Sequence, residues 1–303
     1  MKHLTKIYII FIISLIVIII SLFITYKRQE KFDSEIYELS KHGGFYSQFF
    51  FLLSHFINCK NSKINFKINS ENWTYKSING WEDYFLPVSL IFKDNVTEEV
   101  TINIKDMGGN FSIQEYKDNI PELYKYNENT KNKIELFKQK FNLINYQYDY
   151  ISIRRGDKIS IGEAEIVTEN KYLDLLLNKN PNCKIIFLQT DDYTCYTNIK
   201  DYINERKLNI TVYTNSDATK NGANEIDIQS LNSNDIYEHT IDLISCVDIA
   251  KYANVCILEY SSNISRFIKL YHEHPENVYD VNSGISEIDY TRLQCPGYND
   301  PKL

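Results

Sequence analysis

The chain has 303 residues, 43% of them hydrophobic and 24% charged, which is enough to bury a sizeable core in one large or two smaller domains. Its net charge is −7 and its sequence pI is about 5.5. A protein that binds nucleic acid needs a basic face to neutralise phosphates, so this acidic balance argues against nucleic acid as a partner.

The N-terminus carries an uncharged apolar run at 7–26. A helix of that length spans ~30 Å, the thickness of the hydrocarbon core of a bilayer. A cleaved signal peptide is the alternative, but its apolar region is shorter, roughly 7–15 residues, and ends in a small-x-small site that this run lacks. We therefore expect a short tail at 1–6 and an uncleaved transmembrane signal anchor at 7–26. Lysines flank both ends, so charge alone leaves the orientation open.

Residues 27–40 are charged and predict a short stem, and 41–145 are expected to form an N-terminal lobe. Gly43 and Gly44 open an aromatic-rich run through Phe56 that predicts a buried helix. The further elements expected in this lobe are half-buried strands at 64–68 and 100–104 and a polar helix at 118–143.

Strand and helix patterns alternate more clearly in 146–303, which are expected to form a second lobe. The strand-like runs lie at 147–154, 184–189, 209–214 and 255–259, and the helix-like runs at 170–178, 194–206, 236–253 and 262–272. This alternation predicts an α/β fold with parallel βαβ units in a doubly wound sheet, where ligands bind beyond the carboxyl ends of the strands. Arg154, Asp191 and Ser261 lie at or just past expected strand ends, so we expect them to meet on one rim.

Arg154 and Arg155 end the first of these strands, and Asp157, Lys158 and Glu163 follow them. A guanidinium fork matches phosphate geometry bidentately, which suits an enzyme that neutralises a departing pyrophosphate without a metal. A surface salt-bridge cluster is the alternative interpretation.

Six cysteines could form up to three disulfides in a secretory compartment, and their connectivity is left open. Cys256 lies in an apolar run and is expected to be a small buried hydrophobe.

Four segments resemble, in the same order, motifs of the core α1,6-fucosyltransferase family, which transfers fucose from GDP-fucose. They are the tryptophan-containing segment 72–89, the Arg-Arg segment 153–158, the segment 186–192 that ends in Thr-Asp-Asp, and the Ser-Ser segment 260–266. Lys41 and the glycine-containing stretch from Gly44 to Gln48 are similar, less closely, to the family's opening glycine-rich loop.

The resemblance implies a fold of the GT-B type, with two Rossmann-like lobes built on parallel sheets and the nucleotide bound mainly by 146–303. It also implies a single-pass type II protein of the Golgi or an equivalent secretory membrane, with a cytosolic tail and a lumenal catalytic domain. The family's coiled-coil stem and SH3 domain have no counterpart in this sequence, so we expect the catalytic core alone.

The resemblance implies roles for the two arginines. Arg154 matches the arginine that contacts the pyrophosphate of the donor. Arg155 matches its neighbour, and we predict that a salt bridge with Asp191 or Asp192 holds it. Adjacent aspartates could suggest a metal, but they are weak evidence for one. The family needs no metal, so we expect no cofactor beyond GDP-fucose as the donor substrate.

The general base is expected a few residues later. A one-residue insertion aligns Glu163 with the family's candidate base, tuned by Lys158, and Asp157 completes the catalytic set. The alternative is that Glu163 or Glu165 is a solvated loop acid.

Donor binding is expected to involve the positions that match the family's motifs. They are Lys41, Gly44, Ser152, Arg154, Gly156, Asp191, Asp192, Asp242, Asp248, Ser261, Ser262 and Asn263. Two of them depart from the family: Ser152 replaces a donor-contacting histidine, and Gly156 replaces a threonine. The spacing to the family's guanine-reading aspartate is ambiguous: Asp242 and Asp248 both fit it roughly, and ungapped counting reaches Cys246. An aspartate suits guanine because one carboxylate can accept from both N1–H and the exocyclic amine.

The function predicted is therefore a membrane-anchored, inverting, metal-independent fucosyltransferase that acts on a glycan or glycoprotein. Three alternatives stay open: transfer to a protein hydroxyl or a different glycan position, use of another GDP-sugar, and a catalytically inactive relative that binds a glycan or nucleotide.

Overall fold

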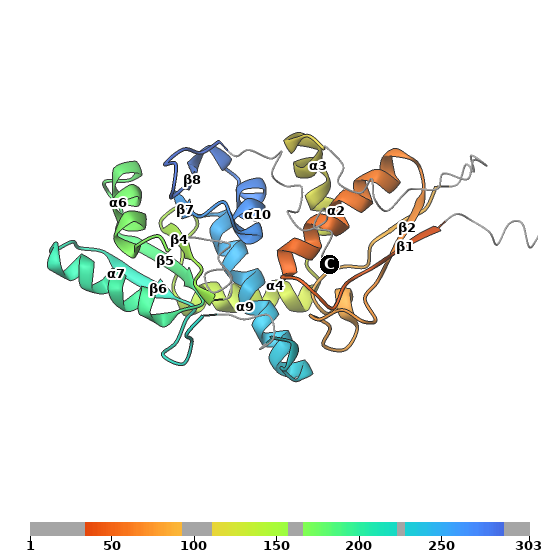
Figure 1. The fold of residues 1–303 in the computed structure, drawn as a ribbon, viewed down its shortest axis with the longest axis horizontal. Helices are drawn as coiled ribbons and strands as arrows, with labels where there is room; N and C mark the ends of the chain where they lie inside the picture. Colours follow the sequence, from red (N-terminus) through yellow and green to blue (C-terminus); the bar gives the residue numbers. More distant parts are fainter. Residues whose placement is uncertain (1–33, 93–110, 157–165, 223–227, 288–303) are drawn as a thin grey trace, which may run out of the picture.

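A computed structural model describes residues 34–92, 111–156, 166–222 and 228–287. Within these ranges a five-stranded sheet lies on one side of the molecule together with α6 (Glu169–Lys179) and α7 (Tyr193–Glu205). Helix α2 (Phe45–Asn61) and two strands lie on the other side, and α4 (Glu128–Lys140) and α9 (Ser233–Lys251) lie between them (Figure 1). None of the helices in these ranges is long and apolar enough to cross a bilayer. The span expected at 7–26 and the strand expected at 100–104 lie outside them.

The C-terminal lobe is the parallel sheet that the alternating pattern predicts. Its strand order is β6-β5-β4-β7-β8, and every neighbouring pair is parallel. The strands are β4 (Asp149–Ile153), β5 (Ile185–Thr190), β6 (Thr211–Thr214), β7 (Cys256–Leu258) and β8 (Val278–Asp280). The helices are α6 (Glu169–Lys179), α7 (Tyr193–Glu205), α9 (Ser233–Lys251) and α10 (Asn263–Tyr271), and the turn η3 (Pro275–Asn277) precedes β8. The four predicted strands and four predicted helices are confirmed, and β8 is an addition.

The two faces of this sheet have different cores because side chains alternate along each strand. Ile151 and Ile153 of β4 pack with Leu173 and Cys195 in the core under α6 and α7. Tyr150 belongs to the larger core that includes α9 and the N-terminal lobe.

The N-terminal lobe contains a smaller, mixed sheet of order β1-β2-β3. Strand β1 (Ser34–Glu38) runs parallel to β2 (Asn65–Asn69), and β3 (Ser89–Leu90) runs antiparallel to β2. The prediction of parallel sheets in both lobes is therefore wrong for this one, because the chain reverses between β2 and β3. The strand expected at 64–68 is confirmed as β2.

The stem expected at 27–40 includes a strand, because 34–38 pair with β2 and Tyr37 packs against the core. The aromatic helix expected after Gly44 is confirmed as α2 (Phe45–Asn61).

The single polar helix expected at 118–143 is in fact two, α3 (Ile113–Leu123) and α4 (Glu128–Lys140). Asn127 starts the second helix, because its side-chain oxygen accepts the Thr130 N–H at 2.8 Å. A bridge between Phe85 and Tyr126 holds the residues before it extended.

The tryptophan-containing segment is part of the hydrophobic core. Trp73 is 5% exposed and Trp81 3%, and the short helix η1 (Gly80–Asp83) carries the second of them. The Asp83 carboxylate accepts four backbone N–H groups, from Ser77, Ile78, Asn79 and Gly80, at 2.8–3.0 Å. This segment therefore builds the lobe.

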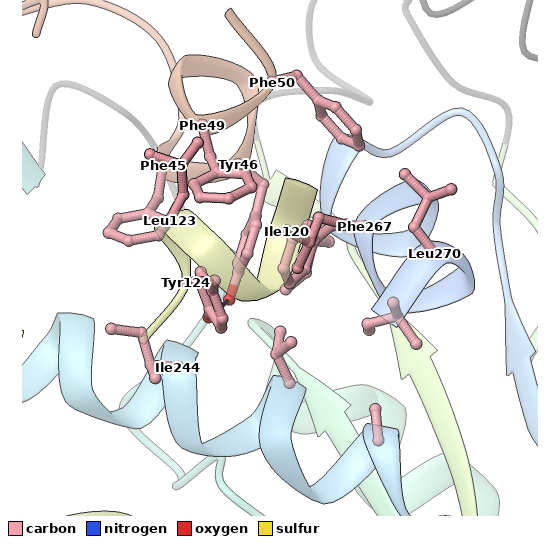
Figure 2. Packing of buried hydrophobic residues seen from close by; sticks show 14 of the residues in the cluster. Phe45, Tyr46, Phe49, Phe50, Ile120, Leu123, Tyr124, Ile244, Phe267 and Leu270 are labelled. Atoms are coloured by element: carbon pink, nitrogen blue, oxygen red, sulfur yellow. Dashed lines mark hydrogen bonds between the residues drawn. The ribbon is translucent and has the colours of Figure 1, made fainter. Parts of the chain in front are cut away.

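Aromatic rings join the two lobes (Figure 2). Phe267 of α10 lies 4.7 Å from the Tyr46 ring of α2 and 4.8 Å from the ring of Tyr124, which follows α3. The two tyrosine hydroxyls are hydrogen-bonded at 2.6 Å, and burial raises the pKa of both phenols. The lobes therefore share one core across α2, α3 and α10.

Five of the six cysteines lie in the described ranges, and all five are buried: Cys59, Cys183, Cys195, Cys246 and Cys256. The expectation that Cys256 is a buried hydrophobe is confirmed by its 0% exposure. No pair of these five forms a disulfide, so in the described part of the chain packing, not cross-linking, accounts for the cysteines.

Candidate functional site

Three loops with polar motifs leave the same edge of the C-terminal sheet. Parallel pairing sets Ile153 of β4 opposite Thr190 of β5, so Arg154 and Asp191 begin neighbouring loops. On the other side β4 pairs with β7, and the Ser261–Ser262 loop follows that strand. The predicted meeting of three motifs at one rim follows from this strand order.

Arg155 points to the α6 side of the sheet. Its guanidinium donates to Glu169 at 2.6 Å and to the Val167 carbonyl at 2.7 Å, and the Arg155 and Glu169 side chains are 11% and 15% exposed. Burial disfavours both charges, but the ion pair outweighs it, so the pKa of Glu169 is lowered and that of Arg155 raised. The prediction of a salt bridge with Asp191 or Asp192 is wrong, because strand alternation directs Arg155 toward α6.

Asp191 contacts the backbone of Arg155 instead. Its Oδ1 accepts the Arg155 N–H at 2.8 Å, and its carbonyl accepts the Gly222 N–H at 2.8 Å. Asp192 caps α7, where its Oδ1 accepts the backbone N–H and the hydroxyl of Thr194. Asp191 thus fixes the loop that carries Arg155, and Asp192 fixes the start of α7. In the described ranges no group of three or more acidic, histidine or cysteine side chains could hold a metal.

Arg154 is half-buried, and strand alternation assigns it to the opposite face from Arg155, the face of Tyr150 and Ser152. Ser152 itself is only 7% exposed. Its hydroxyl and that of Tyr150 both donate to the side-chain oxygen of Gln189. Ser152 therefore lies below the rim and supports the strand end from which Arg154 leaves.

The serine loop meets the N-terminus of α10. The Ser261 hydroxyl donates to Glu259 at 3.0 Å, and Asn263 accepts a hydrogen bond from Arg266. Ser262 is the N-cap residue, is 4% exposed and makes no side-chain capping bond. Among the described residues its Oγ has no hydrogen-bond partner, so a buried hydroxyl and the N–H groups of a helix start lie together at this rim.

The two candidate aspartates on α9 differ in their surroundings. Asp248 forms an ion pair with Lys138 of α4 at 2.6 Å, and their side chains are only 9% and 13% exposed. Asp242 is half-buried, and burial raises its pKa while Lys220 and Lys140 oppose that rise. Asp248 is therefore committed to holding α4 and α9 together, and Asp242 is the better candidate for a ligand.

Sequence reasoning missed the loop that follows β6. Its Lys220 lies close enough to Asp242 and His239 to affect both, and burial together with Lys220 lowers the pKa of His239. The Lys220 carbonyl accepts the Tyr193 N–H at 3.0 Å, and Asn221 forms a bridge with Asp192. No motif marks these residues, and only the pairing of β5 with β6 brings them to the rim.

The glycine-rich loop of the N-terminal lobe reaches the C-terminal lobe. The Lys41 carbonyl accepts the Thr74 hydroxyl at 2.5 Å and the Gln229 side-chain amide at 3.1 Å. Gly44 is the N-cap of α2, and a Cβ added there would meet nothing within 4 Å. Gln48 donates to the Gly43 carbonyl at 2.8 Å and fixes the turn before the helix.

Three of the predicted catalytic residues, Asp157, Lys158 and Glu163, lie outside the described residues. Their roles stay predictions, and so does the independence from metal.

No family model and no curated protein matches this sequence. Among solved structures, the fold is similar to that of NodZ α1,6-fucosyltransferase soaked with GDP-fucose, with a TM-score of 0.54 and 10% identity over 80% of this chain and 93% of that chain. It is also similar to a mutant of Arabidopsis thaliana FUT1 in complex with GDP, with a TM-score of 0.50 and 7% identity over 82% of this chain and 70% of that one. At such low identity the likeness establishes the fold: an α/β fold with a parallel sheet, like that of fucosyltransferase structures.

Proposed function

We propose that this protein transfers fucose from GDP-fucose to a hydroxyl group of a glycan, with inversion and without a metal. The observation that carries the proposal is the meeting of the Arg154, Asp191 and Ser262 loops at one edge of the parallel sheet. Its fold resembles that of a fucosyltransferase whose crystal was soaked with GDP-fucose. Ligands of such sheets bind at this edge.

The chemistry requires positive charge at the leaving phosphate. The acceptor oxygen attacks C1 of fucose as the bond from C1 to the β-phosphate oxygen breaks, and the electron pair of that bond stays on GDP. Arg154 stabilises the charge that develops there, because donors aimed at charge in the transition state lower the barrier most. The buried Ser262 hydroxyl and the start of α10 supply further hydrogen-bond donors.

The proton of the acceptor hydroxyl passes to a carboxylate, for which Glu163 is our candidate, with Lys158 as the cation that adjusts its basicity. Arg155 has a supporting part in this scheme. Its guanidinium is bound to Glu169 on α6, so it anchors the loop and leaves the phosphate to Arg154.

Asp242 recognises the guanine base of the donor nucleotide. A guanine offers N1–H and an amino group on one edge, and a single carboxylate accepts from both. Lys220 adds positive charge beside that carboxylate, and Asp248 is excluded from the role by its bond to Lys138. This assignment makes GDP the preferred nucleotide over ADP.

We also propose that residues 7–26 anchor the protein in a secretory-pathway membrane, with the catalytic lobes in the lumen. The length and lack of charge of that run support the anchor.

The direct test is transfer of labelled fucose by the full chain in detergent, with EDTA present and a panel of glycan acceptors. We expect transfer from GDP-fucose and a marked loss in Glu163→Gln. GDP binding without turnover on any acceptor would instead indicate an inactive relative that binds the nucleotide. Transfer only to a protein hydroxyl, or only from a different GDP-sugar, would make the protein a transferase of that kind. Absence of both GDP binding and turnover contradicts the proposal.

A further inference from the structure

Two glycines from different loops lie in contact at the functional edge of the sheet. A Cβ built on Gly222 would lie 2.8 Å from Cα and 2.9 Å from N of Gly156, whereas ordinary contact begins at 3.4 Å. Gly222 also has φ +101°, in the region that favours glycine. No larger residue fits at 222 unless one of the two loops moves.

The loop of Gly222 cannot easily move away from Gly156, because hydrogen bonds hold it on the side opposite Gly156. The Gly222 N–H donates to the Asp191 carbonyl at 2.8 Å, and the Lys220 carbonyl accepts the Tyr193 N–H at 3.0 Å. Asn221 adds the bridge to Asp192. This segment, residues 220–222, is therefore bound to the start of α7, and we call it the strap.

The loop of Gly156 is fixed on its other side. Arg155 is bound to Glu169 through its side chain and to Asp191 through its backbone N–H. Gly156 therefore lies between an anchored Arg155 and the strap. A displacement of Gly156 would therefore be taken up within the short turn 154–156, because Arg155 is held at both its N–H and its side chain.

We propose that Gly222 is a positioning residue for Arg154. Its backbone contacts Gly156 and so fixes the conformation of the turn 154–156. That turn positions the Arg154 guanidinium beside the leaving phosphate. The proposal rests on the proposed function and adds to it a residue that touches no substrate. A methyl group at 222 requires a shift of at least about 0.6 Å, the difference between 3.4 and 2.8 Å. A misplacement on the order of 1 Å lowers a rate by ~10²-fold.

The test compares Gly222→Ala with Gly284→Ala in the full chain. Gly284 also has a positive φ, +70°, but a Cβ there would meet only Leu175 Cδ1, at 3.7 Å. Both variants thus carry backbone strain, and only the first pushes on Gly156. The measurements are GDP release from GDP-fucose, GDP affinity by calorimetry, and the thermal midpoint.

We expect Gly222→Ala to lower kcat by roughly 10- to 100-fold. The KM for GDP-fucose and the affinity for GDP should change little, because Arg154 acts on charge that develops in the transition state. Gly284→Ala should keep the wild-type kcat, and its thermal midpoint should fall about as much as that of Gly222→Ala. Equal kcat values in the two variants would overturn the inference and leave the proposed function intact. A wild-type chain with neither turnover nor GDP binding overturns both.

If Gly222→Ala does not fold, Asp191 tests the same linkage. Asp191→Asn keeps an oxygen that can accept the Arg155 N–H, and Asp191→Ala removes it. The expected order of kcat is wild type, Asp191→Asn, Asp191→Ala, with KM less affected. Wild-type kcat in both variants, or a rise in KM alone, contradicts the positioning role.

Discussion

The two neighbouring arginines lie on opposite faces of the sheet because a strand directs consecutive side chains to opposite sides. Arg155 is bound on the α6 side, where it neutralises Glu169. Strand alternation assigns Arg154 to the opposite face, where we propose that it contacts the nucleotide. The sequence identified both arginines, but not this division, since the partner Glu169 is 14 residues away and carries no motif.

Substitution of each arginine should separate the two tasks. Arg154→Ala should lower kcat by ~10²–10³ with little change in stability, because it removes one charge-stabilising donor. Arg155→Ala should instead lower the free energy of unfolding, because Glu169 is left as a buried, unpaired charge. Arg206→Ala is the control, since its pair with Asp174 is about half exposed, at 45% and 51%, and surface pairs contribute little.

Steady-state rates and urea unfolding of the three variants measure the difference. An Arg154→Ala variant as active as the wild type would remove the main support for the proposed chemistry.

Burial of His272 predicts the direction in which stability changes with pH. It is 2% exposed, and burial lowers its pKa from 6.5 to about 4, with His274 adding to the effect and Glu276 opposing it. Its Nδ1 also accepts the His274 N–H at 2.9 Å, which a protonated ring cannot do. The folded protein therefore binds this proton less well than the unfolded chain does.

The contribution of neutral His272 to the free energy of unfolding is complete above pH 6.5 and is lost as the pH falls toward 4. A difference of this size corresponds to roughly 3 kcal/mol at most. Urea unfolding from about pH 4 to 8 should show the loss. His272→Asn, which keeps an acceptor near the position of Nδ1, should flatten that part of the profile, and an unchanged profile in the variant would argue that other groups cause it.

At the scale of elements, α9 carries two aspartates whose surroundings differ. Its buried Asp248 binds Lys138 of α4, and its half-buried Asp242 faces the charge of Lys220. The two aspartates are six positions apart, close enough that sequence spacing could not choose between them, and their neighbours come from elements distant in the chain.

Substitution of these aspartates should give opposite results. Asp248→Asn leaves the Lys138 charge buried without its partner, which should cost about 3 kcal/mol or more of stability. Asp242→Asn should leave stability nearly unchanged or raise it, because burial already disfavours its charge, but should weaken GDP binding by ~10-fold or more. Calorimetry with GDP and with ADP provides the measurement. Loss of GDP binding in a folded Asp248→Asn variant, with Asp242→Asn unaffected, would reverse the assignment.

Local pattern predicted the elements of the C-terminal lobe well, because β4, β5 and β7 lie in apolar runs that alternate along the chain with helices. It missed β8, because its Val-Tyr-Asp is not part of a continuous apolar run like the one that contains β7, and it missed β1, which lies in a charged stretch. It joined α3 to α4, because the break at Asn127 depends on partners at Glu82 and Asp83. The strap at 220–222 could not be predicted, since its role comes from a backbone contact with Gly156.

At the scale of the molecule, two lobes share one aromatic core. Phe267 of α10 contacts rings from α2 and from the segment after α3, and the same cluster of buried residues extends to Tyr150 and Phe187 of the C-terminal sheet. A shared core couples the lobes in unfolding. The rim at which we propose donor binding is thus held at a fixed position relative to the glycine-rich loop at Lys41, whose carbonyl accepts a hydrogen bond from Gln229.

This coupling predicts a single cooperative unfolding transition. Trp73 and Trp81 are the chain's two tryptophans and both lie in the N-terminal lobe, so their fluorescence reports that lobe, while far-UV circular dichroism reports helices of both. The two signals should change at the same urea concentration.

Phe267→Ala should lower the free energy of unfolding by about 3–5 kcal/mol, because it opens a cavity where the lobes meet. The urea midpoints of fluorescence and of dichroism should fall together. Leu136→Ala, at a side chain that is 62% exposed, should shift neither. If fluorescence and dichroism separate, or if Phe267→Ala moves only one of them, the lobes unfold independently, and the N-terminal loop cannot be held against the donor rim by this core.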